Sequence, residues 1–467
     1  MSAPKRLSTA LALCATLVAC GTPEGRPDTT ALTLANATRA ERAANLPPMK
    51  RFKGTTPAPA PAALRSNAEM SRDFLDLFFQ LETGAELPVF TRFEGPITLR
   101  VTGGPVPASL SADLGDLLTR LRNEAGLSIT RVSSAEAAAI TIELIDPDDL
   151  ARRARDSACI AVADVSSWRE FSSRPTVSWT RITTRTRAAI FIPRGVAPQE
   201  LRDCLHEELA QTLGPLNDLY RLTDSTFNDD NVHSVLTGFD MLMLRAAYAP
   251  ELRSGMDRAT VSALIGPLLD RLNPRGRTGG TSATRPTPPA FSTAIKGAIE
   301  RGSTARRLAA ANRAVAIARE QGWRDGRAGL AYFLRGRILL PSDQDAALTA
   351  LLTARDLYDG SALTRYHAAN VALPLAALAL RRGEFDTVIA LTSTAIPAAT
   401  QAQNAALLSS LMFAKAEALT RMGRASEARA VRLDSLGWAR YGFGTTRAVR
   451  DREAEFTDLA RASQNTN

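Results

Sequence analysis

Hydrophobic and polar residues alternate in two different ways along the chain. Between residues 66 and 272, short apolar runs interrupt segments of helical period. Four of these runs are apolar enough and short enough to predict strands: Ile97–Val101, Ile140–Ile145, Cys159–Val162 and Ala188–Pro193. Because helical segments lie between the strands, the pattern predicts an α+β domain.

Three segments of this region space their apolar residues as amphipathic helices do. Residues 74–81 form the first, which we expect to dock on the rest of the domain. Residues 114–121 form the second, and Ser111 is expected to cap it. Pro198–Leu213 follows the last strand and ends at Gly214. A site in this domain is therefore expected on the helix after the last strand.

Beyond residue 290 the period is helical throughout. Residues 273–290 are rich in Gly and Pro and predict a linker. Residues 291–460 then read as pairs of helices with short turns, most clearly Leu411–Met422 and Ala425–Leu436. This spacing is typical of a tetratricopeptide-like helical array, with an irregular helical bundle as the alternative.

The first 65 residues read as an export signal followed by a tether. A basic start and a short apolar stretch lead to Leu17-Val18-Ala19-Cys20-Gly21. This order resembles a bacterial lipobox, which implies removal of residues 1–19 and lipid attachment to Cys20. Gly21 implies the outer rather than the inner membrane. Residues 20–65, rich in Ala, Pro and Thr, predict a tether, so the body is expected to face the periplasm.

The predicted export signal and lipid anchor indicate a role for each of the four cysteines. Cys14 leaves with the signal and Cys20 is lipidated, so Cys159 and Cys204 remain. An even pair in an oxidising compartment predicts a disulfide. The chain-entropy relation gives it about 4 kcal/mol for a loop of roughly 45 residues. The alternative is two buried thiols.

The amino-acid composition excludes several classes of protein. With 467 residues, 45% of them hydrophobic and 22% charged, the chain has room for two or three domains and is not wholly disordered. The net charge of +9 is spread along the chain, and no nucleic-acid-binding signature accompanies it. From residue 290 onward, 24 basic and 16 acidic residues leave eight positive charges, which favours an acidic partner for the helical array. The basic stretch with Arg181, Arg185 and Arg187 is interpreted as a solvated edge that prevents strand pairing.

The helix after the last strand carries a motif that is similar to the zinc-peptidase pattern H-E-x-x-H. That pattern places two imidazoles one helical turn apart and a glutamate beside the first to activate water. If the motif starts at His206, the second ligand position falls on Ala210 and the turn glycine comes one residue late. Starting instead at Glu207 puts Glu208 at the base position and Gly214 at the turn. In that second register the three histidine positions of the zinc-peptidase pattern are occupied by Glu207, Gln211 and Asn217.

The residues that follow fit the second register. Ser225–Asp229 lies where metzincin peptidases have a methionine turn, with Phe227 in place of the methionine. Asp240 then opens a helix that ends near Tyr248. Through these motifs, the segment 70–260 resembles the uncharacterised bacterial family known as domain of unknown function 2927. Trp438–Gly444, near the C-terminus, recurs in similar proteins. The resemblance implies a secreted protein with a zincin-like domain, a mixed sheet plus an active-site helix, and no established activity.

The donors left at the motif are oxygen atoms, and zinc prefers imidazole or thiolate. Glu207, Gln211, Asn217 and Asp218 would suit Ca²⁺, Mg²⁺ or no metal. Glu208 is a candidate general base; a solvated helix face is the alternative for both glutamates. His206 is expected at the surface or behind the site, and neither His233 nor His367 has metal-ligand spacing.

Three hypotheses follow from the sequence. The first is an envelope lipoprotein whose degenerate metzincin-like domain is non-catalytic and whose array binds a protein or peptide. The second is an atypical metal-dependent peptidase or cell-wall hydrolase. The third is a structural scaffold of the envelope.

Overall fold

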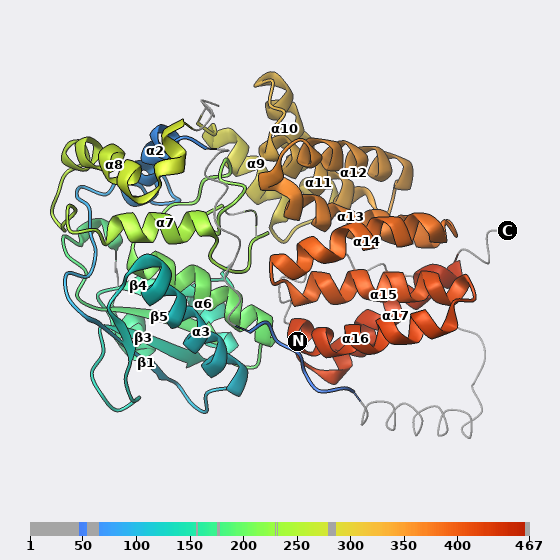
Figure 1. Ribbon diagram of the computed structural model, residues 1–467, viewed down its shortest axis with the longest axis horizontal. Coiled ribbons are helices and arrows are strands. Elements are labelled where there is room, and N and C mark those ends of the chain that lie inside the picture. The colour runs from blue at the N-terminus through green and yellow to red at the C-terminus, as the bar shows by residue number, and fades with distance from the viewer. Residues whose placement is uncertain are drawn as a thin grey trace, which may run out of the picture.

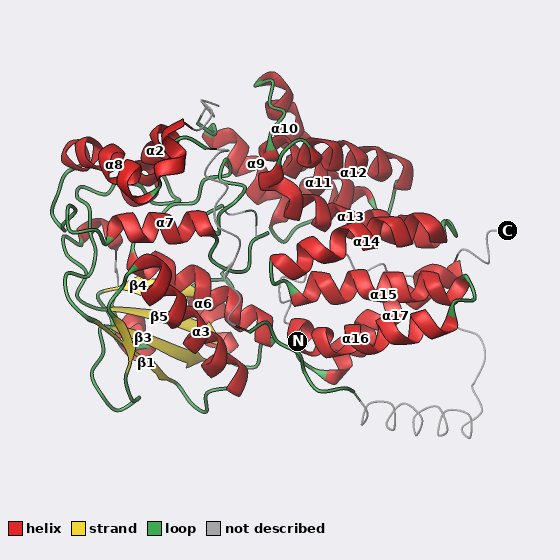
Figure 2. Cartoon of the chain, viewed as in Figure 1, coloured by secondary structure: helices red, strands yellow, loops and turns green. Residues whose placement is uncertain are grey.

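A sheet domain and an all-helical region make up the molecule (Figures 1 and 2). The computed structural model describes residues 46–53, 65–155, 157–174, 178–228, 230, 232–278 and 286–462. The predicted α+β class of the first part and the all-helical class of the second are confirmed. Cys20 and the predicted signal lie outside the described residues. No helix of the described part has the length and apolar character needed to cross a membrane.

The sheet has five strands in the order β2-β1-β3-β5-β4. Neighbouring strands run parallel except β4, which is antiparallel to β5 at one edge. Their bounds are β1 Ile97–Thr102, β2 Ile129–Arg131, β3 Ile140–Ile145, β4 Ile160–Ala163 and β5 Ala188–Pro193. The sheet is mixed, as predicted; β2 was not predicted, because three residues are too few to show alternation.

Both faces of the sheet are covered, because successive strand residues point to opposite sides. Ile190 and Ile192 of β5 join the core beneath α3 (Ala108–Ala125) and α6 (Pro198–Leu213). Ala189 and Phe191 pack on the other side with apolar residues of α4 (Pro147–Arg153) and α5 (Trp168–Ser173). The helix after the last strand is thus fixed against the sheet along its length.

The remaining elements of the domain are α2 (Asn67–Phe78), α7 (Gly238–Ala247), α8 (Arg258–Leu272) and the 3₁₀ turns η1 (Trp179–Arg181) and η2 (Pro274–Thr278). The predicted capping of the 114–121 helix by Ser111 is wrong. That helix, α3, begins at Ala108 after Pro107, and the Ser111 N–H already donates to the Pro107 carbonyl (3.0 Å). Ser111 therefore lies inside the first turn.

The helical region packs consecutive helices against each other. A tight turn at Gly423 joins the predicted pair Leu411–Met422 and Ala425–Leu436, and a similar turn lies at Gly383. Gly383 and Gly423 have φ of 72° and 74°, a region that favours glycine. η2 and the start of α9 occupy the two ends of the predicted linker, and residues 279–285 lie outside the described part. The bounds are α9 Pro289–Ile299, α10 Thr304–Glu320, α11 Gly326–Leu339, α12 Gln344–Asp359, η3 Ala362–Thr364, α13 Arg365–Arg381, α14 Phe385–Gln401, α15 Ala405–Arg421, α16 Ala425–Phe443 and α17 Thr446–Ala462.

The two parts meet along a polar seam. The Gln199 side chain of α6 donates to Asn404 and accepts from the Ala406 N–H (both 3.0 Å). Tyr441 of α16 donates to the Asp113 carboxylate of α3 (2.6 Å). Groups that are buried and paired in this way hold a defined geometry, so the array has a fixed position on the sheet domain.

Candidate functional site on helix α6

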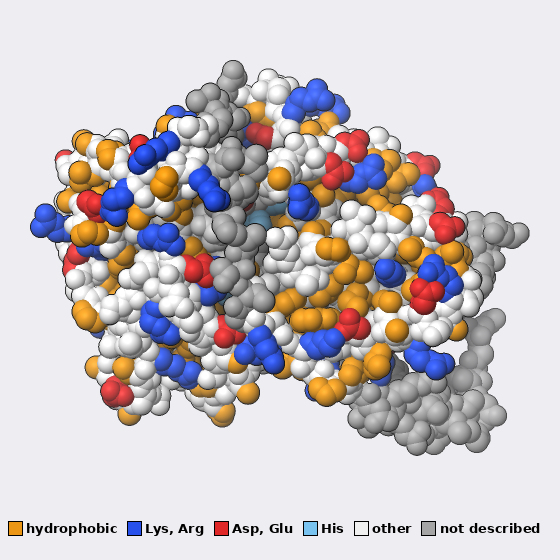
Figure 3. All heavy atoms as spheres, in the orientation of Figure 1, with side chains coloured by type: hydrophobic (Ala, Val, Ile, Leu, Met, Phe, Trp, Pro, Cys, Tyr) orange, Lys and Arg blue, Asp and Glu red, His pale blue; other side chains and the backbone are white. Residues whose placement is uncertain are grey.

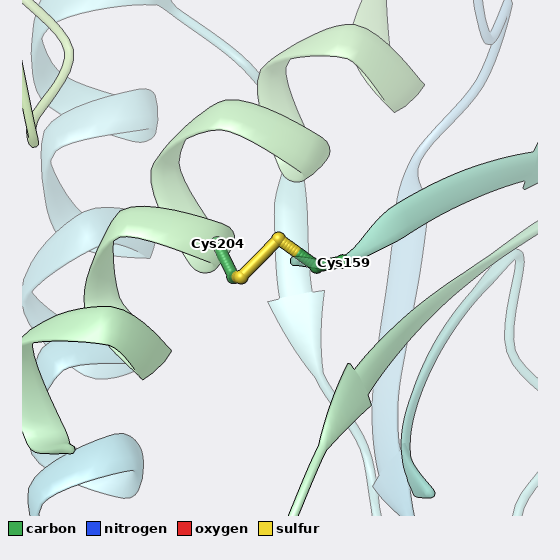
Figure 4. The surroundings of a disulfide bond; sticks show 2 residues. All are labelled: Cys159 and Cys204. Carbon is green, nitrogen blue, oxygen red and sulfur yellow. A yellow bond between two sulfur atoms is a disulfide. The ribbon is translucent and has the colours of Figure 1, made fainter. Parts of the chain in front are cut away.

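A disulfide fastens α6 to the strand that borders the sheet. Cys159, just before β4, and Cys204 on α6 are bonded with a Cα–Cα distance of 6.0 Å (Figure 4). This is the pairing that the cysteine assignment predicts. It holds the motif-bearing helix beside the β4 edge.

Glu208 faces that edge strand and is only 6% exposed. The Asp164 N–H donates to the Arg187 carbonyl across the β4–β5 pair. In an antiparallel pair only every second residue bonds to the neighbouring strand, so the Ala161 N–H points away from β5, toward the open edge of the sheet. There it lies close enough to the Glu208 carboxyl to lower the pKa of that group. The other oxygen, Oε2, is buried without a hydrogen-bond partner. Glu208 is therefore not on a solvated helix face.

The charge state of Glu208 follows from this environment. Burial raises the pKa of the carboxyl well above its usual range, and the charges of Glu207 and Glu82 raise it further. The Ala161 N–H lowers the pKa but is the smallest of these effects. A raised pKa keeps the carboxyl protonated to a higher pH than in a free glutamate, and the protonated form cannot accept the proton that a general base takes from water.

One of the predicted ligand positions, Asn217, is taken up by local hydrogen bonds. The Asn217 amide donates to the Asp76 carbonyl (3.0 Å), and its oxygen accepts from the Asp218 N–H (3.0 Å). Glu207 and Gln211 are half-buried on α6. Among the described residues, no three His, Cys, Asp or Glu side chains gather so that they could hold a metal ion. With Asn217 engaged locally, the set does not fit zinc.

Gly214 ends α6 for a steric reason. A Cβ at this position would lie 2.5 Å from the Phe78 ring, which is far closer than real contacts allow. The glycine required by the motif spacing thus also lets the chain pass α2.

Arg185 lies at the C-terminal end of α6, and for this residue the interpretation as a solvated edge is wrong, whereas Arg181 is exposed. The Arg185 guanidinium is buried and donates to the carbonyls of Gln211, Thr212 and Gly214, each at 2.6 Å. Burial lowers its pKa to about 10, so the side chain keeps its charge at neutral pH. A cation at this end satisfies carbonyls that the helix leaves open. A local sequence pattern gives no sign of this role, because all the partners are distant in the chain.

The turn at Ser225–Phe227 is held by Asp240. Its carboxylate accepts from the Ser225 hydroxyl (2.5 Å), the Thr226 N–H (3.1 Å) and the Thr237 N–H (2.7 Å). Thr237 and Asp240 form a capping box at the start of α7. Phe227 is fully buried below this turn. The predicted helix-opening role of Asp240 is thus accompanied by a second one, which is to fix the turn.

The remaining motif positions are structural as well. Tyr248 donates to the Leu213 carbonyl (3.0 Å) at the end of α6. His206 is not at the surface: it is 3% exposed, and its Nδ1 accepts from the Leu236 N–H (3.1 Å). Burial and nearby arginines hold its pKa well below the usual range, so it is a neutral core histidine.

His233 and His367, far apart in the sequence, meet at the seam. Their ring centroids lie 5.7 Å apart, and His367 Nε2 lies 2.9 Å from the Asp230 carboxylate. His233 Nε2 lies 2.9 Å from the Thr223 carbonyl. Both histidines therefore contribute to the contact between the sheet domain and the array. Neither belongs to the motif on α6.

A cavity of about 490 Å³ lies elsewhere, at the carboxyl ends of β1 and β2. Gly103, Gly104, Arg131 and two serines are among its lining residues. None of the predicted site residues lines it.

Fold and site together define a two-part protein in which a motif-bearing α/β sheet domain precedes a helical array. Residues 67–266 match the family described as protein of unknown function (DUF2927). The match covers 200 of the 467 residues and agrees with the resemblance described from the sequence. No curated protein is similar to the chain.

Proposed function

We propose that this protein is a non-catalytic binding protein of the cell envelope, held there by lipid on Cys20. The DUF2927 domain supplies a rigid base, and the helical array supplies the surface that takes a protein or peptide partner. One observation carries the non-catalytic part of the proposal: Glu208 is buried beside the edge strand of the sheet, and this burial raises the pKa of its carboxyl.

The other groups around the motif support the same conclusion. Asn217 serves backbone groups, and Arg185 and Tyr248 fasten the end of α6. A hydrolytic site needs a base and an electrophile aimed at one substrate position. Here the corresponding residues stabilise the join between helix, turn and sheet.

The charge of the array indicates the chemistry of the partner. Arg306 and Arg313 are exposed and seven residues apart on α10, so they lie on the same face of that helix. Basic side chains stand out at the end of the molecule formed by α10 (Figure 3). A negatively charged protein segment is the partner that such a face attracts.

This assignment of the surface has a direct test. Replacing both Arg306 and Arg313 by Glu should weaken capture of the partner by the purified, full-length protein. Arg447→Glu is the matched control, because that side chain is 90% exposed on α17. If the control weakens capture as much as the double variant, general charge rather than the α10 face attracts the partner.

The second candidate is an atypical metal-dependent peptidase or cell-wall hydrolase. It is favoured by the mutual influence of three carboxyl groups, those of Glu82, Glu207 and Glu208. Affinity purification of the wild type and of Glu208→Gln from solubilised envelopes separates the two candidates. A binding protein captures the same partners in both forms, whereas an enzyme accumulates intact substrate only in the variant.

A further inference from the structure

Leu46–Lys53 belongs to the predicted tether, yet the structure places this strap against the folded body. It runs in an extended conformation beside α16 and α3 and is drawn in dark blue (Figure 1). The expectation of a free tether over residues 20–65 is therefore wrong for these eight residues. A Pro-Pro pair pre-orders an extended chain, which lowers the entropy lost on docking.

On the array side, the strap bonds to the last turns of α16. The Lys50 N–H donates to the Gly437 carbonyl (3.0 Å), and Arg440 donates to the Pro47 carbonyl (2.7 Å). The Lys50 ammonium pairs with Asp434. A Cβ at Gly437 would lie 3.0 Å from the Lys50 side chain, so the glycine gives the strap its close approach.

On the sheet-domain side, the next two residues reach α3 and α6. Arg51 pairs with Asp116 (2.7 Å) and lies 3.4 Å from Asp113, both on α3. Phe52 is 8% exposed and stacks on Trp438 of α16 with a centroid distance of 4.5 Å. The Arg202 guanidinium of α6 lies 5.8 Å from the same ring. Phe52 therefore sits where the two parts of the molecule meet.

We propose that α3, α6 and α16 together form a peptide groove whose occupant is this chain's own strap. The basic Lys50 and Arg51 match the acidic Asp434 and Asp116, and Phe52 is the buried anchor. Aromatic anchors in such grooves carry much of the binding energy. Since each part of the molecule supplies one side of the groove, the bound strap acts as a clasp across the seam.

The clasp has a consequence for the anchored protein. Residues 54–64 join the strap to Arg65 and the sheet domain. After a cut there, the N-terminal fragment that contains the strap is attached to the body only through the groove. Release of the strap then weakens the seam and frees the body from its N-terminal segment in one step.

The experiment places a protease site within residues 54–64 of the full-length chain. After cleavage, the N-terminal fragment of the wild type should co-elute with the body in size exclusion, and the thermal midpoint should match that of the uncut chain. In Phe52→Ala with Arg51→Ala, the cut fragment should dissociate at least about tenfold faster, and the midpoint should fall. Lys53→Ala, an exposed neighbour, is the matched control and should behave as wild type.

Two results would overturn the clasp. One is immediate loss of the cut wild-type fragment with no change in the thermal midpoint. The other is equal retention of the fragment in the double variant and in wild type. If the double variant does not fold, addition of a synthetic Leu46–Lys53 peptide to the cut and stripped wild-type body decides the question. Recovery of the midpoint supports the clasp, and an unchanged midpoint refutes it.

Discussion

Replacing Glu208 by Gln should make the protein more stable at neutral and alkaline pH. In the variant the amide oxygen faces the Ala161 N–H, and the amide nitrogen occupies the place of the buried, unpartnered Oε2. That nitrogen is a donor near the carboxylates of Glu207 and Glu82, which raise the pKa of the native side chain. The substitution therefore keeps the shape of the side chain while it removes a titrating group.

The sign of the pH effect follows from the raised pKa. Between the unfolded pKa of about 4.3 and the higher folded pKa, the unfolded chain has lost this proton and the folded chain keeps it. The free energy of unfolding therefore falls as pH rises through that window, by at most about 1.4 kcal/mol per pH unit. Because Glu208 is 6% exposed, solvent screening removes little of this effect. In Glu208→Gln the contribution is absent, so the curve is flatter by that amount.

Denaturant unfolding at a series of pH values from 4 to 8 measures the difference. Other buried carboxyls with raised pKa values, such as Asp203 and Asp73, contribute equally to both proteins and cancel. Glu86→Gln, at an exposed carboxyl, is the control and should leave the slope unchanged. Equal slopes for wild type and Glu208→Gln, or a variant that is less stable at pH 8, would refute the argument.

Further predictions concern the supports of the site and the anchor. Cys159→Ser with Cys204→Ser should lower the free energy of unfolding by about 4 kcal/mol, measured in denaturant without reductant, whereas an unchanged midpoint would show that the bond is dispensable. Arg185→Gln leaves carbonyls at the end of α6 without their donor and should cost about 3 kcal/mol or more in the same assay; a loss below about 1 kcal/mol would contradict this. Asp240→Asn should cost about 2 kcal/mol, because an amide hydrogen replaces one acceptor facing backbone N–H groups, and thermal melting checks it. Cys20→Ser should move the protein from the membrane fraction to the soluble fraction on cell fractionation. If the variant stays in the membrane fraction, the lipid is not the anchor.

Much of the local structure could be predicted from the sequence, because its signals are local. α6 has the predicted bounds Pro198–Leu213, since a proline begins the helix and Gly214 ends it. The predicted strand runs recur in the sheet, and the sequence pattern of Asp240 indicates its capping position. These features depend on neighbours within a few residues.

The features that could not be predicted depend on distant partners. Arg185 is in a basic stretch like any exposed one, and only the fold brings it to the end of α6. The composition of the strap is that of a tether, while its docking depends on Trp438 at the other end of the chain. His233 and His367 likewise meet only through the seam. The Trp438–Gly444 segment also lies at the seam: Tyr441 bonds to α3, and Gly442 has no room for a side chain beside Ala406.

The central claim is that the motif on α6 stabilises the fold and performs no hydrolysis. Its most direct test is metal analysis of the purified full-length protein combined with an assay of peptide cleavage, for wild type and Glu208→Gln side by side. The account predicts metal far below one ion per chain and no cleavage that depends on Glu208. Stoichiometric metal together with cleavage that Glu208→Gln abolishes would contradict it.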